Sequence, residues 1–319
     1  MTNKRLHTKK VIVSKFSFCC ILLVIIFQTN QLQAQQQPQY TQYMYNTMSI
    51  NPAYAGSRGM LSAFAMHRNQ WVGMSNAPVT NNLAIHTPLK ESKLGLGLSI
   101  VNDRIGPIDE NLISVDLSYS LQLNQDYQLS MGIKATAQLF SLSPGRLNPE
   151  IPTDPLLQPV NSEFSPNLGA GLYLHSEKAY VGLSVPMFFD RQLLSNDESV
   201  AVRPERMTFY AIGGYVFELS PALDFKPAIM TKIQEGAPMQ VDVSANFRLF
   251  DEFVLGTAYR WSAAFSALAG WQINDRFFVG YAYDVETTPL RHYNSGSHEL
   301  FIRFELLNRE GKIISPRFF

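Results

Sequence analysis

The sequence predicts an all-β protein: an antiparallel transmembrane β-barrel of about 14 strands behind an N-terminal signal peptide. Three observations predict it. The chain opens with an export signal. No later apolar run approaches the roughly 20 residues that a membrane-spanning helix needs. Most of the remainder alternates apolar and polar residues in runs of about ten, whereas strands of soluble sandwiches are usually about five or six residues long.

The export signal occupies the first 34 residues. Residues 1–15 are rich in Lys and Arg, and the apolar run Phe16–Phe27 follows them. Leu32-Gln33-Ala34 completes a small-residue cleavage pattern, so we expect residues 1–34 to be a secretory signal peptide that is cut after Ala34. Both cysteines lie in the apolar run and would leave with the signal. The mature chain would then have no disulfide and no cysteine metal site.

Composition excludes one class of partner. The formal net charge is +0, charged residues make up 16% of the chain, and aromatic residues make up 12%. A nucleic-acid-binding protein usually carries a basic stripe, which this balance does not favour. We therefore expect no nucleic-acid partner.

The strand pattern is strict in several runs. Between Leu112 and Leu121, apolar residues occupy every odd position and polar residues most even ones, and residues 129–139 and 239–249 repeat the pattern. A tilted membrane-spanning strand has this length and this period of two. We expect fourteen such strands in the barrel, residues 61–307. They are predicted to begin near Leu61, Val79, Leu94, Leu112, Leu129, Leu168, Ala179, Met207, Leu223, Met239, Phe253, Phe265, Phe277 and His298.

The connections between these strands mostly alternate between short turns and longer loops, as in outer-membrane barrels with short periplasmic turns. The longer loops are expected at Asn69–Pro78, Asp103–Glu110, Ser143–Phe164, Asp190–Arg206 and Thr287–Gly296. Because the strand count is even, both chain ends are expected on the periplasmic side.

Pro227 lacks an N–H group for the ladder, so we expect a bulge or a strand edge there.

The other side chains of note on the expected strands divide into two groups. Aromatic residues near strand ends suggest interfacial girdles: Tyr180, Phe188, Tyr210, Tyr215, Phe253, Trp261, Trp271 and Tyr281. Charges of both signs are expected on the lumen face: Asp116, Lys134, Asp224, Lys226, Lys232, Asp242, Arg248, Arg260, Arg276, Asp284, Glu299, Arg303 and Glu305. A selective porin usually shows rings of one sign, so this mixture favours an occluded lumen.

The segment between the signal and the first strand, residues 35–60, has a composition of its own. Within Gln39–Gly59, tyrosines precede Asn51-Pro52, which ends any helix begun before it. Gly56 and Gly59 allow a tight reversal into the first strand. The pattern permits two interpretations: a periplasmic-side plug or clamp against the barrel, or a contact for a partner.

Several ordered motifs carry a resemblance. They are Ile50-Asn51-Pro52-Ala53-Tyr54-Ala55-Gly56, Arg68-Asn69-Gln70-Trp71-Val72-Gly73, Ala77-Pro78-Val79-Thr80, His86-Thr87-Pro88-Leu89, Gly95-Leu96-Gly97, Asn102-Asp103-Arg104-Ile105-Gly106 and the closing Ser315-Pro316-Arg317-Phe318-Phe319. Together they resemble the PorP/SprF family of outer-membrane proteins of the type IX secretion system in Bacteroidetes-type bacteria. The resemblance implies a non-enzymatic protein of the cell outer membrane that helps deliver or anchor surface proteins such as gliding adhesins. It implies the secretion machinery, a secreted surface adhesin and a peptidoglycan-linked lipoprotein as partners, with outer-membrane lipids around the barrel.

Candidate partner-binding residues come from these motifs: Asn51, Pro52, Tyr54, Gly56, Arg68, Gln70, Trp71, Arg317 and Phe319. Trp71 with Arg68 is either a girdle pair near the head groups or an anchor for a partner, since Trp, Tyr and Arg dominate binding hot spots. In the periplasmic tail, residues 308–319, Arg317 and Phe319 are either a lipoprotein anchor that shares one surface with the segment from Tyr40 to Gly56 or an assembly signal for insertion.

Catalysis has little support. The histidines are scattered without a His-x-x-x-His pair, and no Gly-x-Ser-x-Gly motif is present. We therefore predict no catalytic residue, no cofactor and no metal site. The main alternative function is a passive porin or uptake channel, and an outer-membrane hydrolase ranks third.

Overall fold

The computed structural model describes residues 38–90, 92–146, 159–189 and 207–306. The chain divides into two compact units, and every strand lies in the unit formed by residues 35–235 and 239–319. The expected signal peptide, residues 1–34, and the expected periplasmic tail, residues 308–319, lie outside the described residues.

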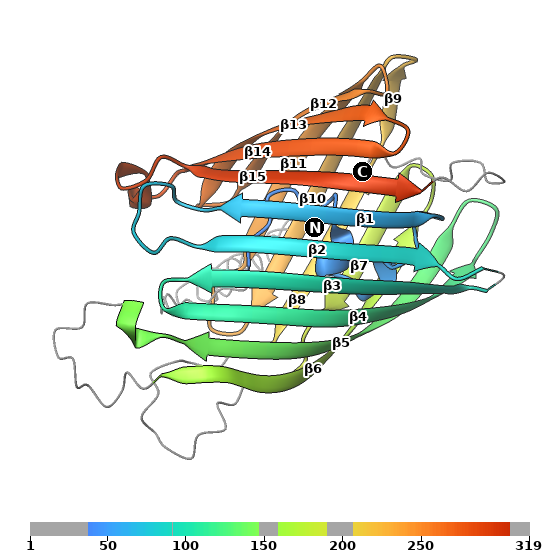
Figure 1. Cartoon of the computed structure of the whole chain (residues 1–319). Helices are drawn as coiled ribbons and strands as arrows, with labels where there is room; N and C mark the ends of the chain where they lie inside the picture. The colour runs from blue at the N-terminus through green and yellow to red at the C-terminus, as the bar shows by residue number, and fades with distance from the viewer. Residues whose placement is uncertain (1–37, 91, 147–158, 190–206, 307–319) are drawn as a thin grey trace, which may run out of the picture. The chain divides into compact units, whose positions relative to one another are not determined.

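Fourteen antiparallel strands form one closed barrel (Figure 1). Each strand pairs with its neighbours in the chain, and β1 pairs with β15 to close the ring. The labels reach β15 because the eighth strand is interrupted and carries two labels, β8 and β9. The strands are β1 (Leu61–Asn69), β2 (Val79–Pro88), β3 (Leu94–Ile105), β4 (Ile108–Gln122), β5 (Gln128–Leu142), β6 (Val160–His175), β7 (Ala179–Val185), β8 (Thr208–Tyr215), β9 (Phe217–Ser220), β10 (Leu223–Gln234), β11 (Gln240–Leu249), β12 (Phe253–Arg260), β13 (Ala264–Asn274), β14 (Phe277–Glu286) and β15 (Ser297–Leu306).

The expected barrel is confirmed, and most strands begin within one residue of the predicted positions. Two strands begin earlier than expected: β4 at Ile108 rather than Leu112, and β6 at Val160 rather than Leu168. The extra part of β6 is polar and largely exposed on both faces, so it has no apolar face for a period-two pattern to reveal.

The two faces of the wall differ as the alternation predicts. In β4, Ile113 and Val115 point outward with 40% and 47% of their surface exposed, while Asp116, which follows Val115, points inward and is fully buried. The same inward burial and outward exposure recur along most strands. An outward apolar face is what a barrel presents to lipid.

The eighth strand is interrupted opposite Pro227. β8 pairs with β10 from Ala228 onward and β9 pairs with β10 up to Phe225, so the register is interrupted between these two residues, at Pro227. A register shift follows at Leu223 and Asp224. The missing N–H group of proline explains the gap, in agreement with the expected irregularity.

The connections differ between the two ends of the barrel. At the end where β1 begins and β15 ends, which we call the terminal end, all connections are short turns. The opposite end, the far end, carries the longer connections 70–78, 143–159, 186–207 and 287–296. Outer-membrane barrels place short turns in the periplasm and longer loops outside, so this arrangement is the one expected if the terminal end faces the periplasm.

Three sequence-based placements are wrong. The loop expected at Asp103–Glu110 is part of a hairpin: Asp103 pairs with Glu110, and the turn is only Gly106-Pro107, with Gly106 at φ +58°. Tyr180 and Tyr210 are buried inside the barrel and belong to no girdle, because each falls on an inward position of its strand. Arg276 is exposed in the turn between β13 and β14 and does not face the lumen.

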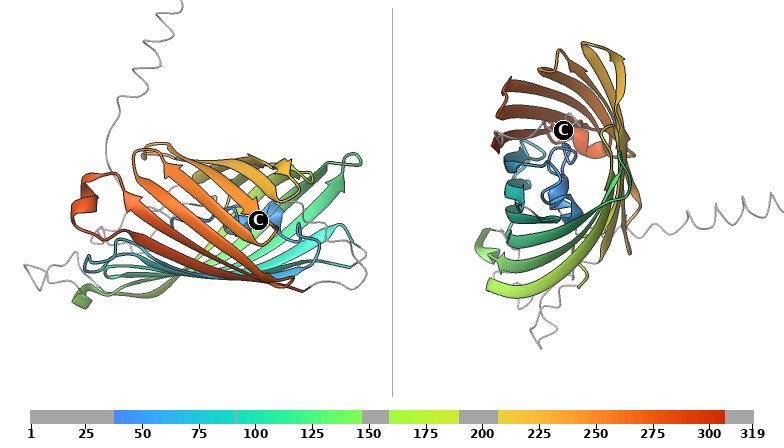
Figure 2. Two further views of the ribbon diagram at one scale, coloured as in Figure 1. Left: turned by 90° about the horizontal axis from the view of Figure 1, so that it is seen from above. Right: turned by 90° about the vertical axis from the view of Figure 1, so that its right-hand side faces the viewer.

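The first described residues, 38–60, fold into the barrel, and we call them the inner segment. Figure 2 shows them, in blue, inside the ring of strands when the barrel is viewed end-on. Nearly all of residues 41–55 are buried. The described helices are single 3₁₀ turns, and none is long and apolar enough to cross a membrane.

Candidate functional site

The inner segment contains two 3₁₀ turns, η1 (Thr47–Ser49) and η2 (Pro52–Tyr54). Asn51 caps η2, because its side-chain oxygen accepts a hydrogen bond from the backbone N–H of Ala53 at 3.0 Å. Proline at the first position of the turn already has the required φ. Gly56, at φ +73°, then turns the chain toward β1. The Asn-Pro-Ala-Tyr-Ala-Gly motif thus encodes a capped turn and its exit.

Glycines in the barrel wall let the inner segment approach the backbone of the strands. A Cβ atom on Gly132 of β5 would lie 2.2 Å from the nitrogen of Ala53, and one on Gly171 of β6 would lie 2.1 Å from Oδ1 of Asn51. Gly95 of β3 makes a similar approach, with 2.3 Å to a backbone oxygen. No residue with a Cβ atom fits at such distances, so the surfaces of the wall and the inner segment are complementary in shape.

At the far end, Glu299 of β15 holds the start of the inner segment. Its two carboxylate oxygens accept hydrogen bonds from the backbone N–H groups of Thr41 and Gln42, each at 2.9 Å. Arg68 of β1 donates to Glu299 at 3.1 Å and to Asp284 of β14 at 2.7 Å. These side chains are almost completely buried. One guanidinium therefore compensates two buried carboxylates, and both bind the segment directly, since Asp284 accepts from the Thr41 hydroxyl at 2.7 Å.

At the terminal end, a second set of polar contacts holds the other part of the segment. Arg58 forms an ion pair with Glu305 of β15. Burial alone would lower the pKa of Arg58, but the attraction of Tyr54 and Glu305 raises it above its ordinary value, so the guanidinium stays charged. The backbone N–H of Gly56 donates to Nδ1 of His86 at 3.1 Å. The inner segment is thus bound to the wall near both ends of the lumen.

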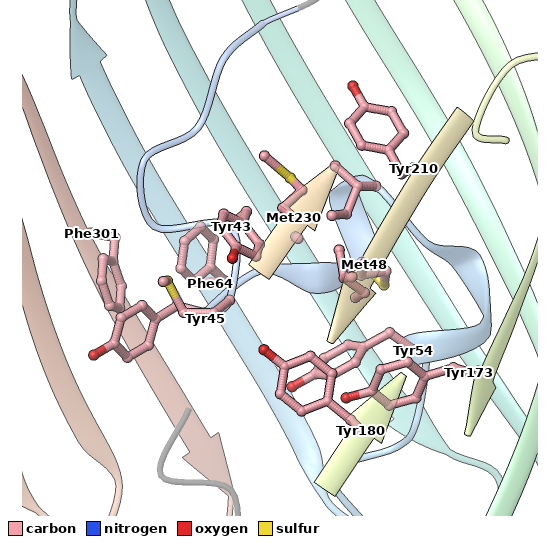
Figure 3. Packing of buried hydrophobic residues seen from close by; sticks show 14 of the residues in the cluster. Tyr43, Tyr45, Met48, Tyr54, Phe64, Tyr173, Tyr180, Tyr210, Met230 and Phe301 are labelled. Carbon is pink, nitrogen blue, oxygen red and sulfur yellow. The ribbon is translucent and has the colours of Figure 1, made fainter. Parts of the chain in front are cut away.

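Aromatic rings fill the space between these polar contacts (Figure 3). The ring of Tyr45 lies 5.2 Å from that of Phe278 and 4.5 Å from that of Phe301. Tyr54 packs edge-on against Tyr173 at 5.4 Å. Ring pairs at such distances contribute about 0.5–1.5 kcal/mol each beyond the burial of their area. The hydrophobic core of this barrel is therefore the interface between the inner segment and the wall.

The lumen offers little chemistry beyond this binding. Its charges pair across strands, as in Asp116 with Lys134 at 2.9 Å and Asp242 with Arg260 at 3.1 Å. A cavity of about 50 Å³ beside Tyr40 has room for one or two water molecules at roughly 30 Å³ each. In the described part of the chain, no group of three or more His, Cys, Asp or Glu side chains is placed to hold a metal ion.

The candidate partner-binding residues of the inner segment are placed inside the barrel. Asn51 and Tyr54 are 1% and 3% exposed, Pro52 is buried, and Gly56 is half-buried. Their described contacts are with the wall and with each other. In this arrangement they offer no surface to another protein.

The remaining candidates divide between the wall and the ends. Arg68 is buried in the network with Glu299 and is not a head-group residue. Gln70 and Trp71 lie in the first far-end loop and are partly exposed. Trp71 has φ +51°, and its indole N–H donates to Glu286 at 2.7 Å. Arg317 and Phe319 lie outside the described residues.

Sequence reasoning placed Glu299 and Asp284 on the lumen face but missed their role as anchors of the inner segment. It also missed the function of Gly132 and Gly171. Both glycines fall on inward positions of long strands, where a side chain is expected. A glycine at such a position indicates that another backbone approaches closely, and this was the signal in the sequence.

Fold and site together define a class of protein: an outer-membrane β-barrel whose lumen holds its own N-terminal segment. Residues 32–304 match the family described as the type IX secretion system membrane protein PorP/SprF. The chain belongs to this family, which makes it a type IX secretion component of the outer membrane and confirms the resemblance noted above.

No curated protein matches the chain. Among solved structures, the Ralstonia pickettii toluene transporter TbuX is 11% identical with a TM-score of 0.48, over 81% of this chain and 92% of that one. The monoaromatic hydrocarbon channel CymD is 13% identical with a TM-score of 0.46, over 83% and 94%. Acinetobacter baumannii Omp33 is 9% identical with a TM-score of 0.42, over 78% and 100%. Likenesses at this level say nothing about function.

Proposed function

We propose that this protein is a non-enzymatic component of the type IX secretion system that helps deliver or anchor surface proteins such as gliding adhesins. The observation that carries the proposal, together with the family, is the inner segment that occupies the lumen from the Glu299 network to the Arg58 ion pair. A protein built this way uses its barrel as a scaffold rather than as a path for solutes.

The alternative function, a passive porin or uptake channel, requires an open lumen. Here the wall glycines Gly95, Gly132 and Gly171, the aromatic core, and the buried carboxylates of Glu299 and Asp284 contact the inner segment. Withdrawal of the segment would remove the hydrogen-bond donors that Thr41 and Gln42 supply to Asp284 and Glu299. The occupied lumen therefore favours the secretion role over passive diffusion.

Partners would reach the barrel from its two ends. At the far end, Gln70 and Trp71 are available to a secreted surface adhesin. At the terminal end, the periplasmic turns and the tail with Arg317 and Phe319 would serve a peptidoglycan-linked lipoprotein and the secretion machinery. Partner contact through the inner-segment candidates would require the segment to leave the lumen. Outer-membrane lipids surround the outward face.

Conductance separates the two functions. In planar bilayers the intact protein should conduct poorly, and a variant lacking Gln39–Gly59 should open the lumen. The matched control is Gly213→Ala, on the outward face of β8, where a Cβ would have only ordinary contacts at 3.6 Å or more. Large and steady channels from the intact protein would support the porin function and count against ours.

Secretion tests the proposal directly. Deletion of the gene should reduce the adhesins on the cell surface while general outer-membrane permeability stays unchanged. At unchanged barrel levels, the variants Phe319→Ala and Trp71→Ala should each co-purify with fewer secretion components than the wild type does. The missing components should differ between the two variants. Unchanged surface proteins in the deletion strain would refute the proposal.

A further inference from the structure

The outward face of the barrel carries a polar row, although most of its side chains are apolar. It crosses β1 to β4 near the far end and comprises His67, Asn81, Asn102, Asn111 and Asp109. The first four are direct cross-strand neighbours in register. Nδ1 of His67 lies 2.8 Å from Oδ1 of Asn81, and Nδ2 of Asn102 donates to Asn111 at 2.9 Å and to Asp109 at 3.0 Å. The side chains thus form one nearly continuous hydrogen-bonded row.

An apolar groove of about 370 Å³ begins directly below this row. Its floor is Ala63 and Ala65 on β1, four and two residues before His67 on the same outward face. Leu83 and Ile100, which line it on β2 and β3, are the outward neighbours of the row residues on those strands. The groove therefore runs along β1 and ends at the polar row.

The width of the groove selects its occupant. Leu83 and Ile85 on β2 form one side, and Ile302 and Phe304 on β15 form the other. The backbones of these two strands are separated by two strand spacings, about 9.6 Å, and their side chains narrow the space further. A helix with its side chains is about 10–12 Å wide and does not fit. A second copy in a two-fold pair would present the same concave groove, which cannot fill this one. A single extended hydrocarbon chain fits.

The chemistry of the row selects the head group. His67 and three asparagines offer amide and imidazole groups, which hydrogen-bond to hydroxyls. The acidic member, Asp109, stands directly opposite the exposed Arg104 on β3, so charges of opposite sign lie side by side at this point. The carboxylate disfavours a phosphate, whereas sugar hydroxyls would find donors and acceptors along the row.

We propose that the outward wall of β15 and β1–β4 binds an outer-leaflet glycolipid. One acyl chain lies in the groove over Ala63 and Ala65, and the sugar hydroxyls hydrogen-bond to the polar row. The far end of the barrel faces outside, which places the head group at the outer surface. This site is independent of the lumen and of the secretion role.

Native mass spectrometry of the purified full chain tests the site, with monoglucosyl-diacylglycerol as the probe and phosphatidylglycerol of the same acyl chains as the comparison. The wild type should bind the glucolipid saturably at one site and more tightly than phosphatidylglycerol. Ala65→Leu fills the groove and should weaken glucolipid binding at least tenfold. Ala269→Leu, an equally outward alanine on β13, should leave it unchanged.

Two further variants separate chain from head group. His67→Leu with Asn81→Leu should abolish the preference for the glucolipid but keep binding of the chain. Ile302→Ala removes one side of the groove and should weaken both lipids, which preserves the test if Ala65→Leu fails to fold. Equal effects of Ala65→Leu and Ala269→Leu would show only non-specific lipid around the barrel and overturn the site. Tighter binding of phosphatidylglycerol would overturn the assigned head group.

Discussion

Replacing Gly132 with Ala should loosen the inner segment without harming the barrel. The new Cβ would lie 2.2 Å from the nitrogen of Ala53 and 2.4 Å from the carbonyl carbon of Pro52. Ordinary contact begins near 3.4 Å, so the wall or the segment must move by about 1.2 Å. Both atoms are backbone in a turn capped by Asn51, and neither can rotate away as a side chain would.

The cost of this overlap can be set against the cost of releasing the segment. Forcing one extra carbon into a well-packed core costs about 1–3 kcal/mol. If the strain is relieved by the segment leaving its place, the equilibrium between bound and released segment shifts by roughly 5- to 150-fold. The strands themselves keep their ladder hydrogen bonds, because Gly132 and its partners lie in register on both sides.

Hydrogen–deuterium exchange measures this shift directly. The backbone amides of Tyr54 and Ala55, which donate to Asn51 and Pro52, should exchange about 5- to 150-fold faster in Gly132→Ala than in the wild type. Gly213→Ala is the matched control, with the same change in a strand but no close contact. Heat-dependent migration on gels should show that all three barrels are folded.

The reasoning would be refuted by unchanged exchange in Gly132→Ala together with unchanged thermal stability. That result would mean that the wall and the segment can accommodate the added Cβ atom at this contact without strain. General acceleration across strand amides would instead indicate that the barrel, and not the segment, absorbs the strain.

Three further predictions follow from other contacts. Arg68→Met leaves two buried carboxylates without their guanidinium and should lower the free energy of unfolding by about 3–5 kcal/mol in denaturant titrations. Much of this loss should be recovered when both carboxylates are also neutralised. A loss below about 1 kcal/mol would contradict the buried network. Trp71→Gly should be less destabilising than Trp71→Ala by about 1 kcal/mol, because glycine adopts a positive φ without strain. Both variants lose the hydrogen bond to Glu286, so this loss cancels in the comparison. The reverse order would show that the loop is unstrained. N-terminal sequencing of the outer-membrane fraction should begin at Gln35, and a soluble periplasmic product would contradict the expected export and insertion.

Much of the barrel could be predicted because its pattern is local. In runs such as Leu112–Leu121, every second residue must suit lipid, so the period of two is written into consecutive positions. Strand number and most boundaries followed from it. The pattern failed where a strand extends into water, as at the start of β6, and where a turn is as short as Gly106-Pro107, because there neither face is constrained by lipid.

The position of the inner segment was decided by the tertiary structure. The motif around Asn51 and Pro52 specified a capped turn, but the same local chemistry would suit a plug or a partner contact. The complementary features lie far away in the chain: Gly132 and Gly171 make room for the turn, and Glu299 captures the backbone some 250 residues upstream. Sequence by itself determined which face of each strand points inward. Only the closed ring decided which of those inward residues meet, because contacts between distant segments depend on the way the whole sheet curls.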